Sequence, residues 1–213
     1  MYIWYNKFTM LYLFEKIDLL EDDFIENVLS LLSEERKIKI SKLRTPMSKK
    51  ASAVAYLLLR IALFIEYNIN EAVLFDYKEH GKPFLKDYPE IFFNLSHSND
   101  TAACAVADEV TGVDVQHIKP IPDNVAKRVL TENEYALFNS SPEPDDYFCK
   151  IWTIKESYIK RTGLGLASEL KEIIADEVTD SQIFKGDDYY CCVCGPAVQI
   201  KYVGREDIEQ LYE

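Results

Sequence analysis

The sequence predicts an α+β fold, because helical and strand-like patterns are mixed in both halves of the chain. Helical periodicity is clearest in 47–67, where apolar residues recur every three or four positions, and in 146–161. Between these helices, short apolar runs at 91–95, 102–107 and 113–115 suit paired strands. With 213 residues, the chain is long enough for one large domain or for two small, tightly joined ones.

The elements of the first half can be placed from their boundary residues. Ser33 is positioned as a helix N-cap, and Gly81-Lys82-Pro83 marks a turn. In chain order we expect a strand over 1–14, a short amphipathic helix over 22–32, a helix that begins after Ser33, the long helix over 47–67 and a strand over 73–77. The aromatic start of the chain lacks a basic segment and a small-residue cleavage site, so we interpret it as a strand of the mature protein and not as a signal peptide.

The second half contains two clear helix starts and one clear helix end. Asp123 is placed to cap a helix that runs to Leu130, and Thr131-Glu132-Asn133-Glu134 has the form of a capping box. Gly163-Leu164-Gly165 ends the helix over 146–161. The remaining elements are an exposed loop over 140–146 and strands over 169–174, 189–194 and 198–203. No internal repeat is detectable, and we divide the chain at Gly112, into 1–111 and 112–213.

Composition indicates a globular protein of the cytoplasm. Hydrophobic residues make up 48% and charged residues 28%, and no apolar run approaches the ~20 residues needed to cross a bilayer. The five cysteines include no second Cys or His pair at zinc-ligand spacing, so we expect reduced core cysteines. A net charge of −12 argues against nucleic acids or anionic membranes as partners. The stretch 36–50, with seven basic residues and no acid, is equally consistent with a solvated helix face and with a local anion site.

The segment from Trp152 to Lys160 is the most informative motif of the chain. In a helix, Trp152, Glu156 and Lys160 lie four residues apart on one face. A carboxylate followed one turn later by an ammonium is commonly a surface ion pair. The apolar neighbours of this pair make the helix unusual, so the two charges lie either at its wet edge or at a functional site.

Two other motifs carry polar residues next to apolar strands. Asp114 and Gln116 are two apart on a predicted strand and therefore face the same side, although an acid after a glycine is more commonly a turn cap. His97, between two serines, is either a loop histidine with satisfied neighbours or part of a small pocket for a phosphate. Together with the acid and the lysine of the preceding motif, these residue types supply metal ligands, phosphate contacts and a proton acceptor, a combination that points to phosphoryl chemistry.

Five segments of the chain, taken in sequence order, resemble the 4′-phosphopantetheinyl transferases. The chain is similar to the longer, Sfp-type branch of that superfamily. The segments are Gly81-Lys82-Pro83, Phe93-Asn94-Leu95-Ser96-His97-Ser98, Gly112-Val113-Asp114-Val115, Thr131-Glu132-Asn133-Glu134-Tyr135 and Trp152-Thr153-Ile154-Lys155-Glu156-Ser157-Tyr158-Ile159-Lys160. The resemblance implies two similar α/β halves related by a pseudo-two-fold, with nucleotide contacts in 1–111 and metal and catalytic residues in 112–213. It also implies transfer of 4′-phosphopantetheine from coenzyme A, bound between the halves, to a serine of an acyl or peptidyl carrier protein. Adenosine 3′,5′-bisphosphate is released, and Mg²⁺, with Mn²⁺ as an alternative, is expected on the pyrophosphate.

Carried over by position, the resemblance implies a role for each residue of the site. The expected metal ligands are Asp114, Glu156 and Gln116. The expected catalytic residues are Glu156 as proton acceptor, Lys160 at the pyrophosphate and Glu134 near the reacting centre. The expected contacts to coenzyme A are Arg36, Lys39, Ser96 and His97 at the 3′-phosphate and Lys82 near the adenine nucleotide.

Two positions depart from the pattern of this branch. Many relatives carry a second acid where this chain has Gln116, so the metal shell loses one negative charge and we expect weaker metal affinity. Relatives often carry a basic residue near Ala51, and here only the hydroxyl that follows it is kept, as Ser52. We expect a monomer. A non-catalytic module of the same fold that binds coenzyme A or a carrier protein is an alternative, as is a metal-dependent hydrolase of a nucleotide pyrophosphate.

Overall fold

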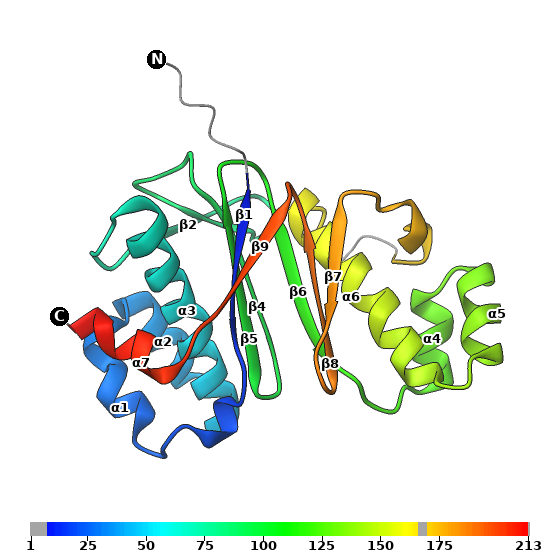
Figure 1. The fold of residues 1–213 in the computed structure, drawn as a ribbon, viewed down its shortest axis with the longest axis horizontal. Coiled ribbons are helices and arrows are strands. Elements are labelled where there is room, and N and C mark those ends of the chain that lie inside the picture. The colour runs from blue at the N-terminus through cyan, green and yellow to red at the C-terminus, as the bar shows by residue number, and fades with distance from the viewer. Residues whose placement is uncertain (1–7, 166–169, 213) are drawn as a thin grey trace.

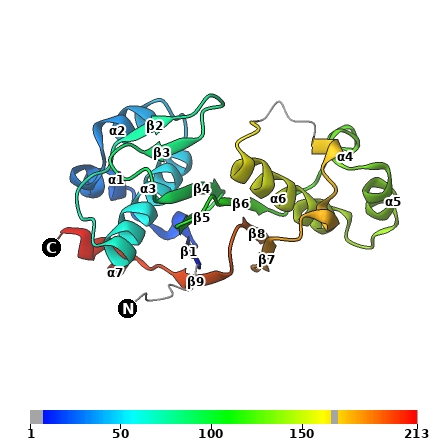
Figure 2. The same ribbon diagram turned by 90° about the horizontal axis from the view of Figure 1, so that it is seen from above.

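The structure, a computed structural model, describes residues 8–165 and 170–212. Two sheets pack against each other, and helices cover the outer face of each sheet (Figure 1). The helices beside the first sheet are α1 (Phe24–Val28), α2 (Glu34–Ser41), α3 (Pro46–Tyr67) and α7 (Arg205–Glu209), and those beside the second are α4 (Asp123–Val129), α5 (Glu132–Ser140) and α6 (Pro144–Thr162). The same two groups of helices lie at opposite ends of the molecule when it is seen from above (Figure 2). The predicted α+β class with two halves is confirmed.

Within the described residues, nine strands form the two sheets and one hairpin. The first sheet contains, in spatial order, β4 (Phe92–Ser98), β5 (Thr101–Ala107), β1 (Thr9–Phe14) and β9 (Val198–Tyr202), and the second contains β6 (Gly112–His117), β8 (Tyr189–Cys194) and β7 (Ser181–Lys185). The hairpin pairs β2 (Phe75–Tyr77) with β3 (Pro83–Leu85). Strand β1 pairs antiparallel with β5 and parallel with β9. β9 and α7 therefore join the first half although both belong to 112–213, and the division of the chain at that position stays a prediction.

The helix α3 is the centre of the first half and confirms the helix predicted over 47–67. The Thr45 side chain caps its start, and Asn68, in a left-handed conformation with φ of 56°, caps its end. Arg60 is 5% exposed, and its guanidinium donates to two backbone carbonyl groups of neighbouring loops, so its role is structural. Among the residues described, no helix combines the length and the apolarity of a membrane span.

The helix α6 is held very close to the second sheet. It ends at Gly163, whose φ of 73° confirms the predicted helix end. A Cβ atom on Gly112 would lie 2.2 Å from the backbone oxygen of Ser157 and 2.4 Å from the backbone nitrogen of Arg161, so only glycine permits this approach. On the neighbouring strand, Cys192 and Cys194 lie 3.2 and 3.1 Å from the Ser157 hydroxyl. All five cysteines are buried and free, as predicted.

Several local predictions differ from the structure. Instead of the strand predicted over 169–174, residues 170–172 form a 3₁₀ helix, and Leu170 packs against the apolar cluster between α4, α5 and α6. Residue 169 lies outside the described residues. Pro122, and not Asp123, is the N-cap of α4, because the Asp123 carboxylate bonds to side chains of α4 and α5. The loop predicted over 140–146 is shorter, since α6 already begins at Pro144. The predicted first strand is described from residue 9, and residues 1–7 lie outside the described residues.

Candidate active site

Strands β4 and β6 belong to different sheets, and side chains join them. Three polar side chains of β4 accept hydrogen bonds from the N–H groups of alternate β6 residues. The pairs are Asn94 with Val113 at 2.8 Å, Ser96 with Val115 at 3.2 Å and Ser98 with His117 at 3.2 Å. Alternate residues of a strand share one side, so the polar spacing of β4 builds a seam between the two sheets. We call this set of three contacts the β4–β6 seam.

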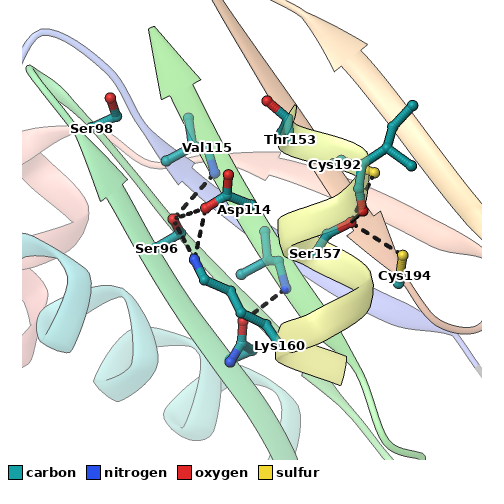
Figure 3. Close-up of polar contacts among 12 residues, drawn as sticks. Ser96, Ser98, Asp114, Val115, Thr153, Ser157, Lys160, Cys192 and Cys194 are labelled. Carbon is teal, nitrogen blue, oxygen red and sulfur yellow. Dashed lines mark hydrogen bonds and ion pairs between the residues drawn. The ribbon is translucent and has the colours of Figure 1, made fainter. Parts of the chain in front are cut away.

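Asp114 lies at the β4–β6 seam, in contact with Ser96 and Lys160 (Figure 3). The Lys160 ammonium donates to Asp114 Oδ1 at 2.7 Å and to Ser96 Oγ at 3.0 Å, and Ser96 Oγ donates to Asp114 Oδ1 at 2.9 Å. Asp114 is 6% exposed, so the ammonium offsets a charge that burial disfavours. The fold thus brings together three of the predicted site residues from β4, β6 and α6.

Glu156 is the second buried acid of the site, with 7% of its surface exposed. Burial raises its pKa, the negative charge of Asp114 raises it further, and Lys160 opposes this shift. Asp114 Oδ2 and Glu156 Oε1 are buried and have no hydrogen-bond partner among the described residues. Buried carboxylate oxygens without donors are costly, so this arrangement suits an additional cation between or beside the two acids.

The donor set fits a hard divalent cation. Mg²⁺ is usually bound through one or two protein carboxylates and completes its shell with water and substrate phosphate, and Asp114 and Glu156 provide two unpartnered carboxylate oxygens. Within 8–165 and 170–212, no three His, Cys, Asp or Glu side chains gather as a complete metal site. An ion at these acids would therefore share its coordination shell with a substrate or with water.

A group of cations from the first half lies near Lys160. Arg36 is 7% exposed and donates to Ser52 Oγ at 3.2 Å. His97 is exposed, but neighbouring atoms partly desolvate its imidazole and lower its pKa, and the positive charges of Lys160, Lys39 and Arg36 lower it further. Partial desolvation, followed by the charge of Arg36, also lowers the pKa of the exposed Lys39. Cations that repel one another in this way are stabilised by an anion with several charges, such as a phosphate.

Lys82 lies at a cleft of about 530 Å³ between the two halves. Its ammonium donates to the backbone oxygens of Thr111 at 3.1 Å and Arg161 at 2.9 Å. Burial, followed by the charges of neighbouring cations, lowers the pKa of Lys82 to about 8. The same cleft is lined by Glu156 and Lys160, so residues of the β2–β3 hairpin and of α6 face one space.

Gln116 lies beside a separate, smaller cavity of about 110 Å³. Its amide donates to the backbone oxygen of His117 at 3.3 Å, and Phe148 and Trp152, which stack at 5.9 Å, line the same cavity. Trp152 therefore does not line the cleft that Glu156 and Lys160 share. The role of Gln116 as a metal ligand stays a prediction.

Glu134 lies in the interior of the second half, where the predicted capping box with Thr131 is confirmed. Its carboxylate forms an ion pair with Lys155 at 2.5 Å, and Lys155 is completely buried. A lysine in a helix is usually exposed, so the residue type of Lys155 does not indicate its buried position. Its place between Ile151, Ile154 and Ile159 is the feature that could have revealed it.

Two family models match successive parts of the chain. Residues 21–109 match the model described as 4′-phosphopantetheinyl transferase, N-terminal, and residues 111–199 match that of the 4′-phosphopantetheinyl transferase superfamily. The two matched segments follow each other along the chain, as the two halves of the fold do. The acids and cations of the site lie between these halves. Fold and matches together define a phosphopantetheinyl transferase-like protein.

Named relatives confirm the family. Over 161 residues the chain is 30% identical to 4′-phosphopantetheinyl transferase Sfp of Bacillus subtilis (strain 168), which covers 74% of this chain and 72% of the relative. It is 32% identical over 154 residues to 4′-phosphopantetheinyl transferase ffp of Bacillus subtilis (71% and 69%), and 31% identical over 161 residues to psf-1 of Bacillus pumilus (74% and 69%). The chain belongs to the 4′-phosphopantetheinyl transferase superfamily and to its Sfp-type branch, as the sequence motifs predicted.

Proposed function

We propose that this protein transfers the 4′-phosphopantetheine group of coenzyme A to a serine of an acyl or peptidyl carrier protein. Adenosine 3′,5′-bisphosphate is the second product. The observation that carries the proposal is the pair of buried acids, Asp114 and Glu156, beside Lys160, with Glu156 and Lys160 lining a cleft between the halves. Membership of the superfamily supports the same reaction.

In this proposal, cations of the first half bind coenzyme A. Arg36, Lys39 and His97 contact the 3′-phosphate, and Lys82 lies near the adenine nucleotide. The positive charges of Lys160, Lys39 and Arg36 lower the pKa of His97, and the charge of Arg36 lowers that of Lys39, which supports an anion site there. The Ser96 hydroxyl already serves Asp114, Lys160 and the β4–β6 seam, so we assign it to holding these groups in place.

Asp114 and Glu156 would hold a divalent cation, Mg²⁺ or Mn²⁺, with the amide oxygen of Gln116 as a neutral further candidate. When bound, such an ion neutralises charge on pyrophosphate oxygens. The two unpartnered carboxylate oxygens support this assignment. Replacement of Asp114 by Asn should weaken Mn²⁺ binding, which electron paramagnetic resonance measures without turnover.

The chemistry breaks a phosphoanhydride bond and forms a phosphate ester bond. The carrier serine oxygen forms a bond to the β-phosphorus of coenzyme A, and the bond from that phosphorus to the bridging pyrophosphate oxygen breaks. Glu156 accepts the serine proton, directly or through a water. Lys160 donates to the negative charge that develops on the leaving bisphosphate.

The test is the mass of a purified apo-carrier protein after incubation with coenzyme A and MgCl₂. We expect a gain equal to one phosphopantetheine group. Glu156→Gln should lower the turnover by about 10²- to 10⁴-fold, while the melting temperature shows that the variant is folded. Glu143→Gln, which changes an exposed acid at the start of α6, is the matched control and should keep full activity. Near-normal turnover in Glu156→Gln contradicts the proposed base.

The same assay separates the alternatives. Binding of coenzyme A or carrier without a gain in mass identifies a binding module. Release of adenosine 3′,5′-bisphosphate in the absence of any carrier identifies a hydrolase. Modification of several carriers from fatty-acid, polyketide and peptide synthesis, compared by rate, shows which class is the substrate.

The carrier must dock without help from the overall charge. Carrier proteins of this reaction are acidic and the enzyme carries a net charge of −12, so docking depends on a local basic surface and on apolar contacts. Lys42, Arg44 and Lys49 are the candidates, whereas Lys50 is excluded, because its buried ammonium donates to the backbone oxygen of Leu20 at 2.6 Å. We propose a monomer of the cytoplasm with neither nucleic acids nor membranes as partners.

A further inference from the structure

Both carboxylate oxygens of Glu134 are engaged inside the protein. Oε2 accepts hydrogen bonds from the Lys155 ammonium at 2.5 Å and from the backbone nitrogen of Thr131 at 2.8 Å, and Oε1 accepts one from the backbone nitrogen of Ala175 at 3.0 Å. Only 6% of the residue is exposed. Burial raises its pKa, but these hydrogen bonds together lower it below the ordinary value. A carboxylate held in its ionised form by three donors is a poor proton acceptor.

Lys155 is equally committed to this contact. None of its surface is exposed, and its ammonium donates to the backbone oxygen of Val129 at 2.9 Å in addition to Glu134. Burial lowers its pKa, and the carboxylate of Glu134 opposes that shift. A buried ammonium requires such a partner, so neither residue is available to a substrate in the cleft.

The pair joins four segments of the second half at one point. Val129 ends α4, Thr131 caps α5, Ala175 begins a short 3₁₀ helix, and Lys155 belongs to α6. Successive residues of a helix are about 100° apart, so Lys155 faces this junction while Glu156, the next residue, lines the cleft. The rotation of α6 is therefore determined on one side by the ion pair and on the other by its close approach to β6.

We propose that Glu134 is a positioning residue, which acts through Lys155 to set the rotation of α6 and hence the placement of Glu156 and Lys160, and that it takes no part in proton transfer. The inference rests on the proposed function and replaces the catalytic role that the family resemblance implies for Glu134. It makes the ion pair a determinant of turnover although neither partner touches the substrate.

The charges of the pair make the inference testable. Removal of one partner of a buried ion pair leaves an uncompensated charge, whereas replacement of both partners is often tolerated. Glu134→Gln leaves the Lys155 ammonium without a counter-charge, and Lys155→Met leaves the Glu134 carboxylate without one. In the double variant no charge remains, and the glutamine amide oxygen can still accept from the backbone nitrogen of Thr131 or Ala175.

The experiment compares the two single variants, the double variant and the control Glu132→Gln, an exposed acid in the first turn of the same helix α5. For each protein, kcat and KM for apo-carrier, the melting temperature and the hydrogen exchange of the α6 amides are measured. We expect each single variant to lower kcat by about 10- to 100-fold, with lower melting temperature and faster exchange in α6. The double variant should return kcat to within about threefold of the wild type, together with protection of α6.

Two results would overturn the inference. A double variant with restored stability and α6 protection but with the low kcat of Glu134→Gln would show that the carboxylate itself is catalytic. Wild-type kcat and α6 exchange in both single variants would show that the pair positions nothing. If the wild-type protein modifies no carrier, the proposed function fails, and the stability and exchange data still decide whether the pair sets α6.

Discussion

Gly112→Ala tests directly how closely α6 must approach β6. The added Cβ would lie 2.2 Å from the backbone oxygen of Ser157, 2.4 Å from the backbone nitrogen of Arg161 and 2.9 Å from its Cα. Ordinary contacts begin at 3.4 Å, so the helix must move away from the strand by about 1.2 Å. All three atoms belong to the backbone, and no change of rotamer can relieve the clash.

The expected cost has two parts. Overpacking of this kind typically destabilises by about 1–3 kcal/mol, which lowers the melting temperature of a chain of this size by about 2–12 °C. The movement also carries Lys160 away from Asp114, which it now contacts at 2.7 Å. A misplacement of about 1 Å near reacting groups can lower a rate by about 10²-fold. We therefore expect a folded enzyme with a large loss of kcat.

The assay is carrier modification followed by mass spectrometry, together with thermal unfolding. Gly204→Ala is the matched control, because its Cβ would meet the flexible carboxylate of Glu206 at 2.4 Å, which can rotate away. We expect this control to lose less than about 1 kcal/mol and to keep its activity. If Gly112→Ala showed the turnover and stability of the control, the idea that α6 is placed by this contact would be refuted.

Three further changes test the substrate and metal contacts. The pKa of Lys82 is lowered to about 8, so its charge is lost as the pH rises through that value. The KM of the wild type for coenzyme A should therefore rise between about pH 7 and about pH 9. In Lys82→Arg the KM should stay constant over this range, because the guanidinium remains charged. Gln116→Glu should lower the half-saturating Mg²⁺ concentration by about tenfold, and an unchanged requirement in a magnesium titration would exclude Gln116 from the metal site. Charge reversal at Lys42 and Arg44 should raise the KM for carrier by about five- to tenfold without change for coenzyme A, and equal effects on both substrates would argue against a docking surface there.

The long helices could be predicted because their information is local. Thr45 and Asn68 cap α3, and Gly163 ends α6, so the boundary residues and the apolar periodicity agree. The strand prediction over 169–174 is wrong because strand formation depends on contacts that are not local. The apolar residues at 170, 173 and 174 indicate burial, but they do not reveal whether a neighbouring strand exists. Strand β7 was missed for the same reason, since its pairing with β8 and its half-buried side chains are properties of the fold.

The site was predictable only to the level of its motifs. The family resemblance indicated which side chains to consider, and the structure brings Asp114, Glu156 and Lys160 together as expected. The family resemblance could not reveal that Ser96 accepts a hydrogen bond in the β4–β6 seam, because that role depends on the register between two sheets. The partner of Glu134 was equally hidden, since Lys155 lies 21 residues further along the chain and two helices must pack before the two charges meet.

The acidic net charge of the chain is compatible with a phosphate-rich substrate, because the net charge acts over long distances whereas the cations of the site act at contact distance. The net charge of −12 sets a long-range field, which salt screens beyond about 8 Å at physiological ionic strength. Within the site, Lys160 already offsets the charge of Asp114, while Arg36 and Lys39 add positive charge from the other half. A ligand whose phosphates contact α2 and α6 at the same time would therefore bridge the β4–β6 seam. The binding of such a ligand would then hold together the two halves whose junction carries Asp114 and Glu156, so ligand binding and the placement of these acids would be coupled through the same few cations.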